Sequence, residues 1–137
     1  MRYLKCALLS VITLLVCVAY AGGVERKEFT ASIDKNGVQW VEILGGSYFF
    51  DPNYIIVKVN VPVKFKIRKE SGLTPHDFVL KAPDAGINIK VDLGADATVI
   101  NFKPTKTGTY YFYCDKKLPF MASHKEKGME GMLDVRE

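Results

Sequence analysis

Residues 63–68 have the sequence Val63-Lys64-Phe65-Lys66-Ile67-Arg68, in which apolar and cationic side chains alternate without interruption. Because successive side chains of a β-strand point to opposite faces, this alternation predicts a strand with one buried and one solvated face. The stretch just upstream, residues 54–59, is mostly β-branched and carries one charge, which predicts a strand buried on both faces over most of its length. Both patterns indicate a fold built from β-strands.

The period of two continues along the chain from Val38, interrupted by turn signals. Strand-like runs recur about every 8–12 residues, as in all-β sandwiches and barrels. We therefore predict one all-β domain over residues 38–137, with Trp40 in its core. The turn signals are Gly45-Gly46, Asp51-Pro52-Asn53 and residues 60–62, 83–86, 94–96 and 105–108.

The first 21 residues have the pattern of a cleavable signal peptide. Arg2 and Lys5 precede an uncharged apolar run, and Ala19-Tyr20-Ala21 forms a small-x-small cleavage site at its end. The run is shorter than the roughly 20 residues that a membrane-spanning helix needs, which favours cleavage over an uncleaved anchor. We expect an exported, periplasmic or otherwise extracytoplasmic protein, attached to a membrane only if this segment remains uncleaved.

Residues 22–37 are polar and are expected to form a flexible lead-in, with a short strand at residues 29–33. The composition of the whole chain is that of a globular protein, with 48% apolar and 25% charged residues, and this argues against disorder. The net charge of +4 is small and dispersed, so nucleic acid is not an expected partner.

Cys114 is the only cysteine outside the predicted signal peptide. A lone cysteine in an oxidising compartment cannot form a disulfide within its own chain. It is then an intermolecular bridge, a buried inert thiol or a protected functional thiolate. Coordination to a metal is one way to protect such a thiol from oxidation.

Four residues with metal-binding side chains stand out: His76, Cys114, His124 and Met129. The last three form the motif Cys114-x9-His124-x4-Met129. Cys114 ends one alternating strand and His76 opens another, so two strand ends and one loop are expected to meet at one pole of a sandwich. Two imidazoles, one thiolate and a weak thioether suit copper, because Cu(I) prefers sulfur and Cu(II) prefers nitrogen. A zinc site is the less suitable alternative, since zinc makes no use of the methionine.

These stretches resemble the cupredoxin family of type 1 blue copper proteins, over about residues 38–137. The resemblance implies a Greek-key β-sandwich that carries out one-electron transfer. The shared stretches are Gly108-Thr-Tyr-Tyr-Phe-Tyr-Cys114, His124-Lys-Glu-Lys-Gly-Met-Glu-Gly-Met-Leu-Asp-Val135, Phe50-Asp51-Pro52 with Val57-Lys58-Val59, and Pro75-His76-Asp77-Phe78.

The resemblance implies one copper ion per chain, held by His76, Cys114 and His124 with Met129 as the axial thioether. Met121 is the alternative axial residue, whereas Met132 is expected to face outward because it alternates with Leu133 and Val135.

Two features depart from the family pattern. Nine residues separate Cys114 from His124, a long loop that is similar to that of copper nitrite reductases. Asp77 follows His76 where the family commonly has Asn, and Asp115 follows Cys114. If the two carboxylates lie close together, one of them needs a hydrogen-bond donor or a raised pKa.

The expected function is that of an exported, monomeric one-electron carrier. Its partners would be a redox donor and acceptor of the cytochrome or oxidase type, bound transiently. An enzyme is not expected, because no histidine remains for a type 2 or trinuclear copper site. A copper chaperone or storage protein that uses the same ligands is the alternative. Residues 118–121, Leu-Pro-Phe-Met, would form an apolar patch beside His124 or, alternatively, pack inward.

Overall fold

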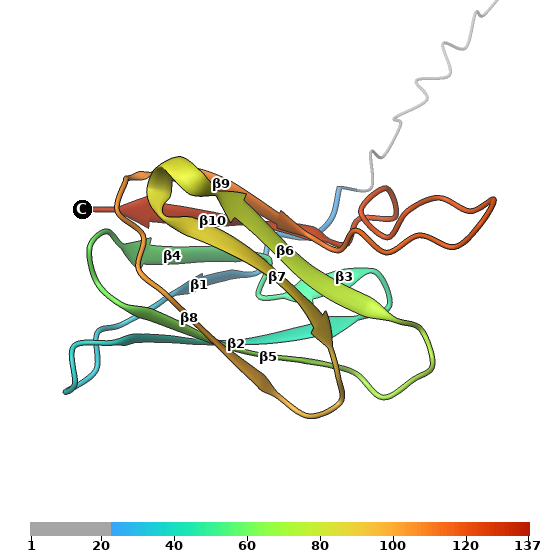
Figure 1. The fold of residues 1–137 in the computed structure, drawn as a ribbon, viewed down its shortest axis with the longest axis horizontal. Helices are drawn as coiled ribbons and strands as arrows, with labels where there is room; N and C mark the ends of the chain where they lie inside the picture. Colours follow the sequence, from blue (N-terminus) through green and yellow to red (C-terminus); the bar gives the residue numbers. More distant parts are fainter. Residues whose placement is uncertain (1–22) are drawn as a thin grey trace, which may run out of the picture.

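The computed structural model describes residues 23–137, which form two β-sheets packed face to face (Figure 1). The predicted all-β sandwich is confirmed. The predicted signal peptide, residues 1–21, lies outside the described residues. The strands are β1 (Glu28–Thr30), β2 (Gln39–Gly46), β3 (Phe49–Asp51), β4 (Tyr54–Lys58), β5 (Val63–Lys69), β6 (His76–Ala82), β7 (Ile87–Leu93), β8 (Thr98–Phe102), β9 (Gly108–Tyr113) and β10 (Glu130–Arg136).

The only helix in residues 23–137 is the single-turn 3-10 helix η1 (Pro83–Ala85). Within this described part of the chain, no helix has the length and apolar character needed to cross a bilayer.

The larger sheet has the strand order β1-β4-β10-β9-β6-β7, and the smaller sheet has the order β3-β2-β5-β8. Strand β4 pairs parallel with both β1 and β10. The remaining neighbours in this sheet are antiparallel: β10 with β9, β9 with β6, and β6 with β7. In the smaller sheet, β2 and β5 are parallel. Several spatial neighbours are therefore distant in sequence, because the chain crosses repeatedly from one sheet to the other.

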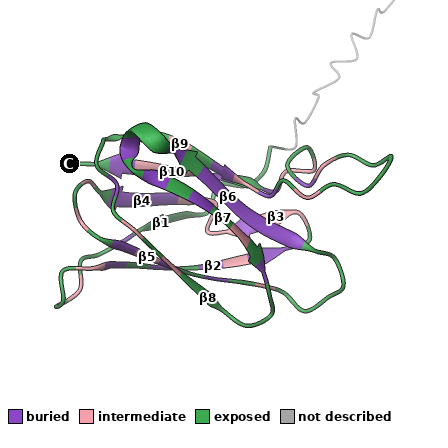
Figure 2. Ribbon diagram, in the orientation of Figure 1, coloured by how far each residue is buried: buried purple, intermediate pink, exposed green. Residues whose placement is uncertain are grey.

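The core lies between the sheets, where the buried faces of the strands meet (Figure 2). In β5 the alternation is as predicted: Val63, Phe65 and Ile67 are buried, and the cations between them point away. In β4 three consecutive residues are buried, also as predicted. Phe78 of β6 contacts rings from both sheets. Its ring centroid lies 6.0 Å from that of Phe65 in β5 and 5.1 Å from that of Phe112 in β9.

Trp40 is not in the core, and this prediction is wrong. Its side chain is 41% exposed on the outer face of β2, where the Lys64 ammonium lies 5.1 Å from its ring centroid. The buried neighbour is Gln39, whose side-chain oxygen accepts from Lys58 N–H at 2.7 Å and whose amide donates to Lys58 C=O at 3.2 Å. A polar side chain that satisfies buried backbone groups thus fixes the face of the strand, and Trp40 takes the other face.

Part of the segment expected to be a flexible lead-in belongs to the sandwich. Strand β1 covers residues 28–30 instead of the expected 29–33, and Ile33 forms only an isolated bridge with Gln39. Ala31 is buried in the core. Asn53 ties this segment down, since its side-chain oxygen accepts from Lys27 N–H at 2.8 Å and its amide donates to the Glu25 carbonyl at 2.8 Å.

Candidate metal centre

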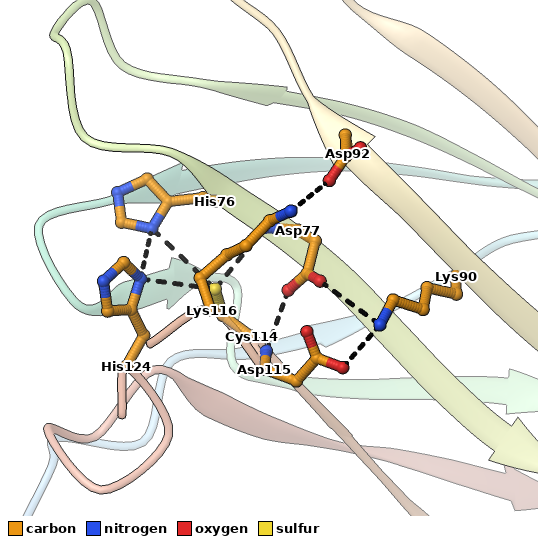
Figure 3. Close-up of polar contacts among 8 residues, drawn as sticks. All are labelled: His76, Asp77, Lys90, Asp92, Cys114, Asp115, Lys116 and His124. Carbon is orange, nitrogen blue, oxygen red and sulfur yellow. Dashed lines mark hydrogen bonds and ion pairs between the residues drawn. The ribbon is translucent and has the colours of Figure 1, made fainter. Parts of the chain in front are cut away.

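The structure brings three of the four candidate metal-binding residues together at one end of the sandwich (Figure 3). The Nδ1 atoms of His76 and His124 are 3.1 Å apart, and Cys114 Sγ lies 3.4 Å from the His124 Nδ1 and 3.9 Å from the His76 Nδ1. All three side chains are buried, with exposures of 5% for His76, 2% for His124 and 0% for Cys114. Three donor atoms therefore face one small, buried volume.

Two of these donors are placed by strands. His76 is the first residue of β6, and Cys114 directly follows β9. The two strands pair antiparallel, with Leu80 opposite Phe112, so their ends meet at the same edge. The backbone N–H of Asp77 donates to Cys114 Sγ at 3.4 Å. Such a hydrogen bond orients the sulfur and tempers its electron density.

The third donor, His124, is placed by a short capped turn in the ligand loop, residues 115–128. Ser123 and Glu126 form a reciprocal cap: the Glu126 carboxylate accepts from Ser123 N–H at 2.6 Å, and Glu126 N–H donates to the Ser123 hydroxyl at 3.2 Å. His124 N–H donates to Lys116 C=O at 2.9 Å. This cap was not predicted from the sequence, although Ser-x-x-Glu is a recognisable signal for it.

Met129 joins the loop back to the strands. Its N–H donates to His124 C=O at 3.0 Å, and its C=O accepts from Cys114 N–H at 3.0 Å. The side chain is fully buried, and a Cβ placed on Gly45 would lie 3.3 Å from its methyl group. Met121, the alternative axial residue, is 46% exposed in the ligand loop. Met132 is half-buried, on the face of β10 opposite to its buried neighbours, as predicted.

A buried carboxylate braces the strand side of the site (Figure 3). Asp77 is fully buried; its Oδ1 accepts from Asp115 N–H at 2.8 Å, and its Oδ2 has no hydrogen-bond partner among residues 23–137. Lys90 Nζ lies 2.6 Å from Asp115 Oδ2 and 4.0 Å from Asp77 Oδ2. Burial raises the pKa of Asp77, and the contacts with Asp77 and Lys90 lower the pKa of Asp115. The expectation for two neighbouring carboxylates therefore holds.

Burial also sets the charge of the donors. It raises the pKa of the Cys114 thiol to about 11 and, together with the nearby His124, lowers the pKa of His76 to about 4. Burial likewise lowers the pKa of His124, and Lys127 adds to the effect. At neutral pH both imidazoles are therefore unprotonated and ready to bind a metal, whereas the thiol must release its proton on binding. Two imidazoles and one thiolate are the trigonal donor set of a type 1 copper centre, so these residues fit one copper ion.

Tyr48 is a residue of the site that was not predicted from the sequence. It lies in the two-residue turn between β2 and β3, and its ring meets both imidazoles edge-on. The ring centroids are 5.0 Å apart for His124 and 6.4 Å apart for His76. Only the turn signal at Gly45-Gly46 marks this region in the sequence, and it says nothing about contact with His76.

The apolar side chains at the tip of the ligand loop point outward. Phe120 is fully exposed, with a left-handed φ of 61°, and Leu118 and Met121 are about half exposed. The alternative in which these side chains pack inward is wrong.

The family of this chain is identified by comparison with known proteins. A family model described as a cupredoxin-like domain matches residues 8–129, which confirms the resemblance drawn from the sequence. A search of curated protein sequences gives no significant match.

Among solved structures, the metal-binding domain of the Cu(I)-exporting P-type ATPase CopA of Streptococcus pneumoniae is similar, with a TM-score of 0.63 and 19% identity over 83% of this chain and 100% of that chain. Auracyanin A, a blue copper protein of Chloroflexus aurantiacus, has a TM-score of 0.53 and 20% identity over 73% and 100% of the two chains. The periplasmic domain of cytochrome oxidase subunit II of Bradyrhizobium japonicum has a TM-score of 0.54 and 18% identity over 72% and 83%. At these identities the likeness shows a shared fold.

Proposed function

The chain belongs to the cupredoxin-like domain family, and from this premise we propose that it is an exported one-electron carrier with a single type 1 copper ion. The observation that carries the proposal is the buried cluster of His76, Cys114 and His124. Because the identities to the solved structures are low, the role of this chain has to be inferred from its own site. The donor set is therefore the main support.

We assign His76 and His124 as the imidazole ligands, Cys114 as the thiolate and Met129 as the axial thioether. Copper bound by these donors would supply a one-electron redox couple. Met129 is favoured over Met121 because it is buried and its backbone bonds to both Cys114 and His124. Met121 is exposed at the tip of the loop.

The residues around the donors favour electron transfer because they hold the donor geometry constant. The β6–β9 pairing fixes His76 and Cys114, and the backbone N–H of Asp77 orients the sulfur. A site that changes little between two oxidation states loses little energy to reorganisation. Phe120 and its apolar neighbours give a partner a small exposed surface on the loop that carries His124, as suits a transient complex.

The proposal includes redox proteins as donor and acceptor, an extracytoplasmic location and a monomeric state. It includes no copper-enzyme role that needs a second copper site, since the chain has only two histidines and both lie in the cluster. A type 2 or trinuclear copper site would require further imidazoles.

The test is the spectrum and redox behaviour of the protein loaded with Cu(II). We expect an intense visible thiolate-to-copper band, reversible one-electron cycling, and loss of the band in Cys114→Ser with the fold retained by circular dichroism. The zinc-loaded protein is the colourless control. Undiminished colour in Cys114→Ser would overturn the ligand assignment, and slow redox chemistry with ready release of copper would indicate a copper chaperone or store instead.

The axial position is tested by a matched pair of variants. Met129→Leu keeps the volume and removes the sulfur, so copper should remain bound while the reduction potential rises, because a donor to Cu(II) is lost. Met121→Leu should leave the potential unchanged. The reverse result would place the axial sulfur in the ligand loop.

A further inference from the structure

The two imidazoles of the site, drawn in Figure 3, are almost fully buried, although His76 is the first residue of its strand and His124 lies in a loop. Tyr48 contributes to this burial: its ring stands nearly perpendicular to both imidazoles, at 75° to His124 and 84° to His76. It reaches them from the β2–β3 turn, a segment that carries none of the donors. One side chain therefore covers the donors of both a strand and a loop.

The backbone of Tyr48 is held in an unusual conformation. Gly46 pairs with Phe49, so the turn between them has only two residues, and Tyr48 is the second, with a φ of 65°. A positive φ at this position of a turn is normally met by Gly or Asn, because a bulky side chain is strained there. Such strain persists where the surrounding contacts stabilise it, and it often marks a functional position. Here these contacts include the packing of the ring against the core and its edge-on contacts with both imidazoles.

Lys127 fastens Tyr48 to the ligand loop. Its Nζ lies 3.2 Å from the Tyr48 hydroxyl, which accepts a hydrogen bond from it, and 4.3 Å from the ring centroid. Lys127 lies between the loop donor His124 and Met129. The β2–β3 turn and the ligand loop are thus joined across the site by one polar contact and one cation–π contact, both at the rim where solvent can compete for them.

The turn that carries Tyr48 also borders a small opening beside His76. This pocket has a volume of about 50 Å³, enough for one or two waters, and its lining includes Ser47, Thr74 and His76. Because Ser47 adjoins Tyr48 in the turn, outward movement of the turn would widen the pocket and expose the imidazoles together. The pocket brings solvent to one of the two imidazoles, that of His76, and the ring of Tyr48 contacts both imidazoles edge-on.

We propose that Tyr48, fastened by Lys127, is the movable cover of the copper site and sets the rate at which the metal enters and leaves. This inference rests on the proposed copper site. Tyr48 acts through the imidazoles and is a positioning residue. The cover would make a carrier retain its copper, which is what distinguishes a carrier from a protein that hands copper on.

The test is the rate at which excess chelator removes Cu(II), followed by decay of the visible band. Tyr48→Ala should release copper at least roughly tenfold faster, equivalent to a barrier lower by about 1.4 kcal/mol. Tyr48→Phe, which keeps the ring and loses the hydroxyl, should accelerate release only slightly, and so should Lys127→Gln. Adding Tyr48→Phe to Lys127→Gln should accelerate release little further, because Lys127→Gln already removes that hydrogen bond together with the cation–π contact.

Lys125→Gln is the matched control. Lys125 lies in the same loop and stacks on Tyr113 at 4.7 Å from the ring centroid, but among residues 23–137 no ring contact joins Tyr113 to either imidazole. Its release rate should equal that of the wild type. Equal acceleration in Lys125→Gln and Lys127→Gln, or an unchanged rate in Tyr48→Ala, would overturn the proposal.

A second measurement needs no copper. In the metal-free protein, peptide-resolved labelling of Cys114 by a thiol reagent should be faster in Tyr48→Ala, and Tyr48→Asn gives the same comparison with a residue suited to the left-handed turn. Faster labelling in a protein that takes up no copper would support the cover and reject the proposed function. A copper-binding wild type with unchanged release and labelling in both variants would reject the cover alone.

Discussion

The two sides of the donor cluster are built in different ways. His76 and Cys114 sit at the ends of paired strands, where the β6–β9 register and a buried phenylalanine layer hold them. His124 sits in a loop, where a Ser123–Glu126 cap and the ring of Tyr48 hold it. The strand side depends on the whole sheet, whereas the loop side depends on a few local contacts. Stability should therefore reside in the first and metal exchange in the second.

The strand side is broken most strongly by Phe78→Ala. Phe78 is fully buried, shares a face of β6 with His76 and contacts rings of both sheets. Its truncation should cost about 3–5 kcal/mol of unfolding free energy, as large-to-small core changes do. Denaturant unfolding of the metal-free protein measures this loss. Phe120→Ala is the control: Phe120 is fully exposed in the ligand loop, and its loss should change stability by less than about 0.5 kcal/mol. Similar costs for both variants would remove the distinction between the two sides.

Acid should destabilise the metal-free protein through His76. Its folded pKa is lowered from 6.5 to about 4, so between these values the unfolded chain binds a proton that the folded chain does not. Stability should be fully present above pH 6.5, fall as the pH decreases towards about 4, and lose nothing more from this group below it. Urea unfolding over a pH series measures the slope. His76→Asn should flatten it, and an unchanged slope would assign the acid sensitivity to other groups.

The loop side is weakened by Ser123→Ala, which removes the cap before His124. The loss should be about 0.5–2 kcal/mol in stability, as for other N-caps, with faster release of copper to a chelator. Ser123→Thr keeps a capping hydroxyl and should behave like the wild type. If Ser123→Ala destabilised the protein as much as Phe78→Ala, the loop would be part of the cooperative core and the comparison would fail.

The smallest effect on the protein itself is expected for Phe120→Ser, at the tip of the ligand loop. Because the side chain is fully exposed, the melting temperature and the copper spectrum should stay nearly unchanged. Electron exchange with a cytochrome c should slow if this tip is the docking surface. Leu73→Ser is the control, since Leu73 is equally exposed but lies outside the ligand loop. A disturbed spectrum or a large loss of stability in Phe120→Ser would contradict the docking role.

Much of the fold follows from the sequence because its strands alternate clearly. The pattern of β5 and the apolar run of β4 gave the correct buried faces, since burial and period determine each other in a sheet. The convergence of His76 and Cys114 was also predictable, because strand ends of one sheet lie together. For His124 the motif is visible in the sequence, and the spacing of Ser123 and Glu126 is a signal for its cap as well.

Other features depend on contacts that no local pattern records. Gln39 is buried because its amide serves the backbone of β4, a partner distant in sequence, and this reversed the expected position of Trp40. Tyr48 contacts the imidazoles because the β2–β3 turn lies at the same end of the sandwich as His76 and His124. Lys90 reaches Asp115 across the sheet from β7. Each of these contacts joins separate segments, so only the assembled fold reveals it.

The parallel pairing of β4 with β10 has a consequence for folding. Tyr54 lies opposite Met132, so a strand from the first half of the chain can complete this pairing only when the final strand is in place. Contacts of this kind form slowly, because the entropy of a long loop is lost before they are gained. The C=O of Met129, just before β10, also closes onto Cys114 N–H. We therefore expect that, before β10 has docked, the thiol and the two imidazoles remain apart and do not form a copper site. Copper loading should then follow folding.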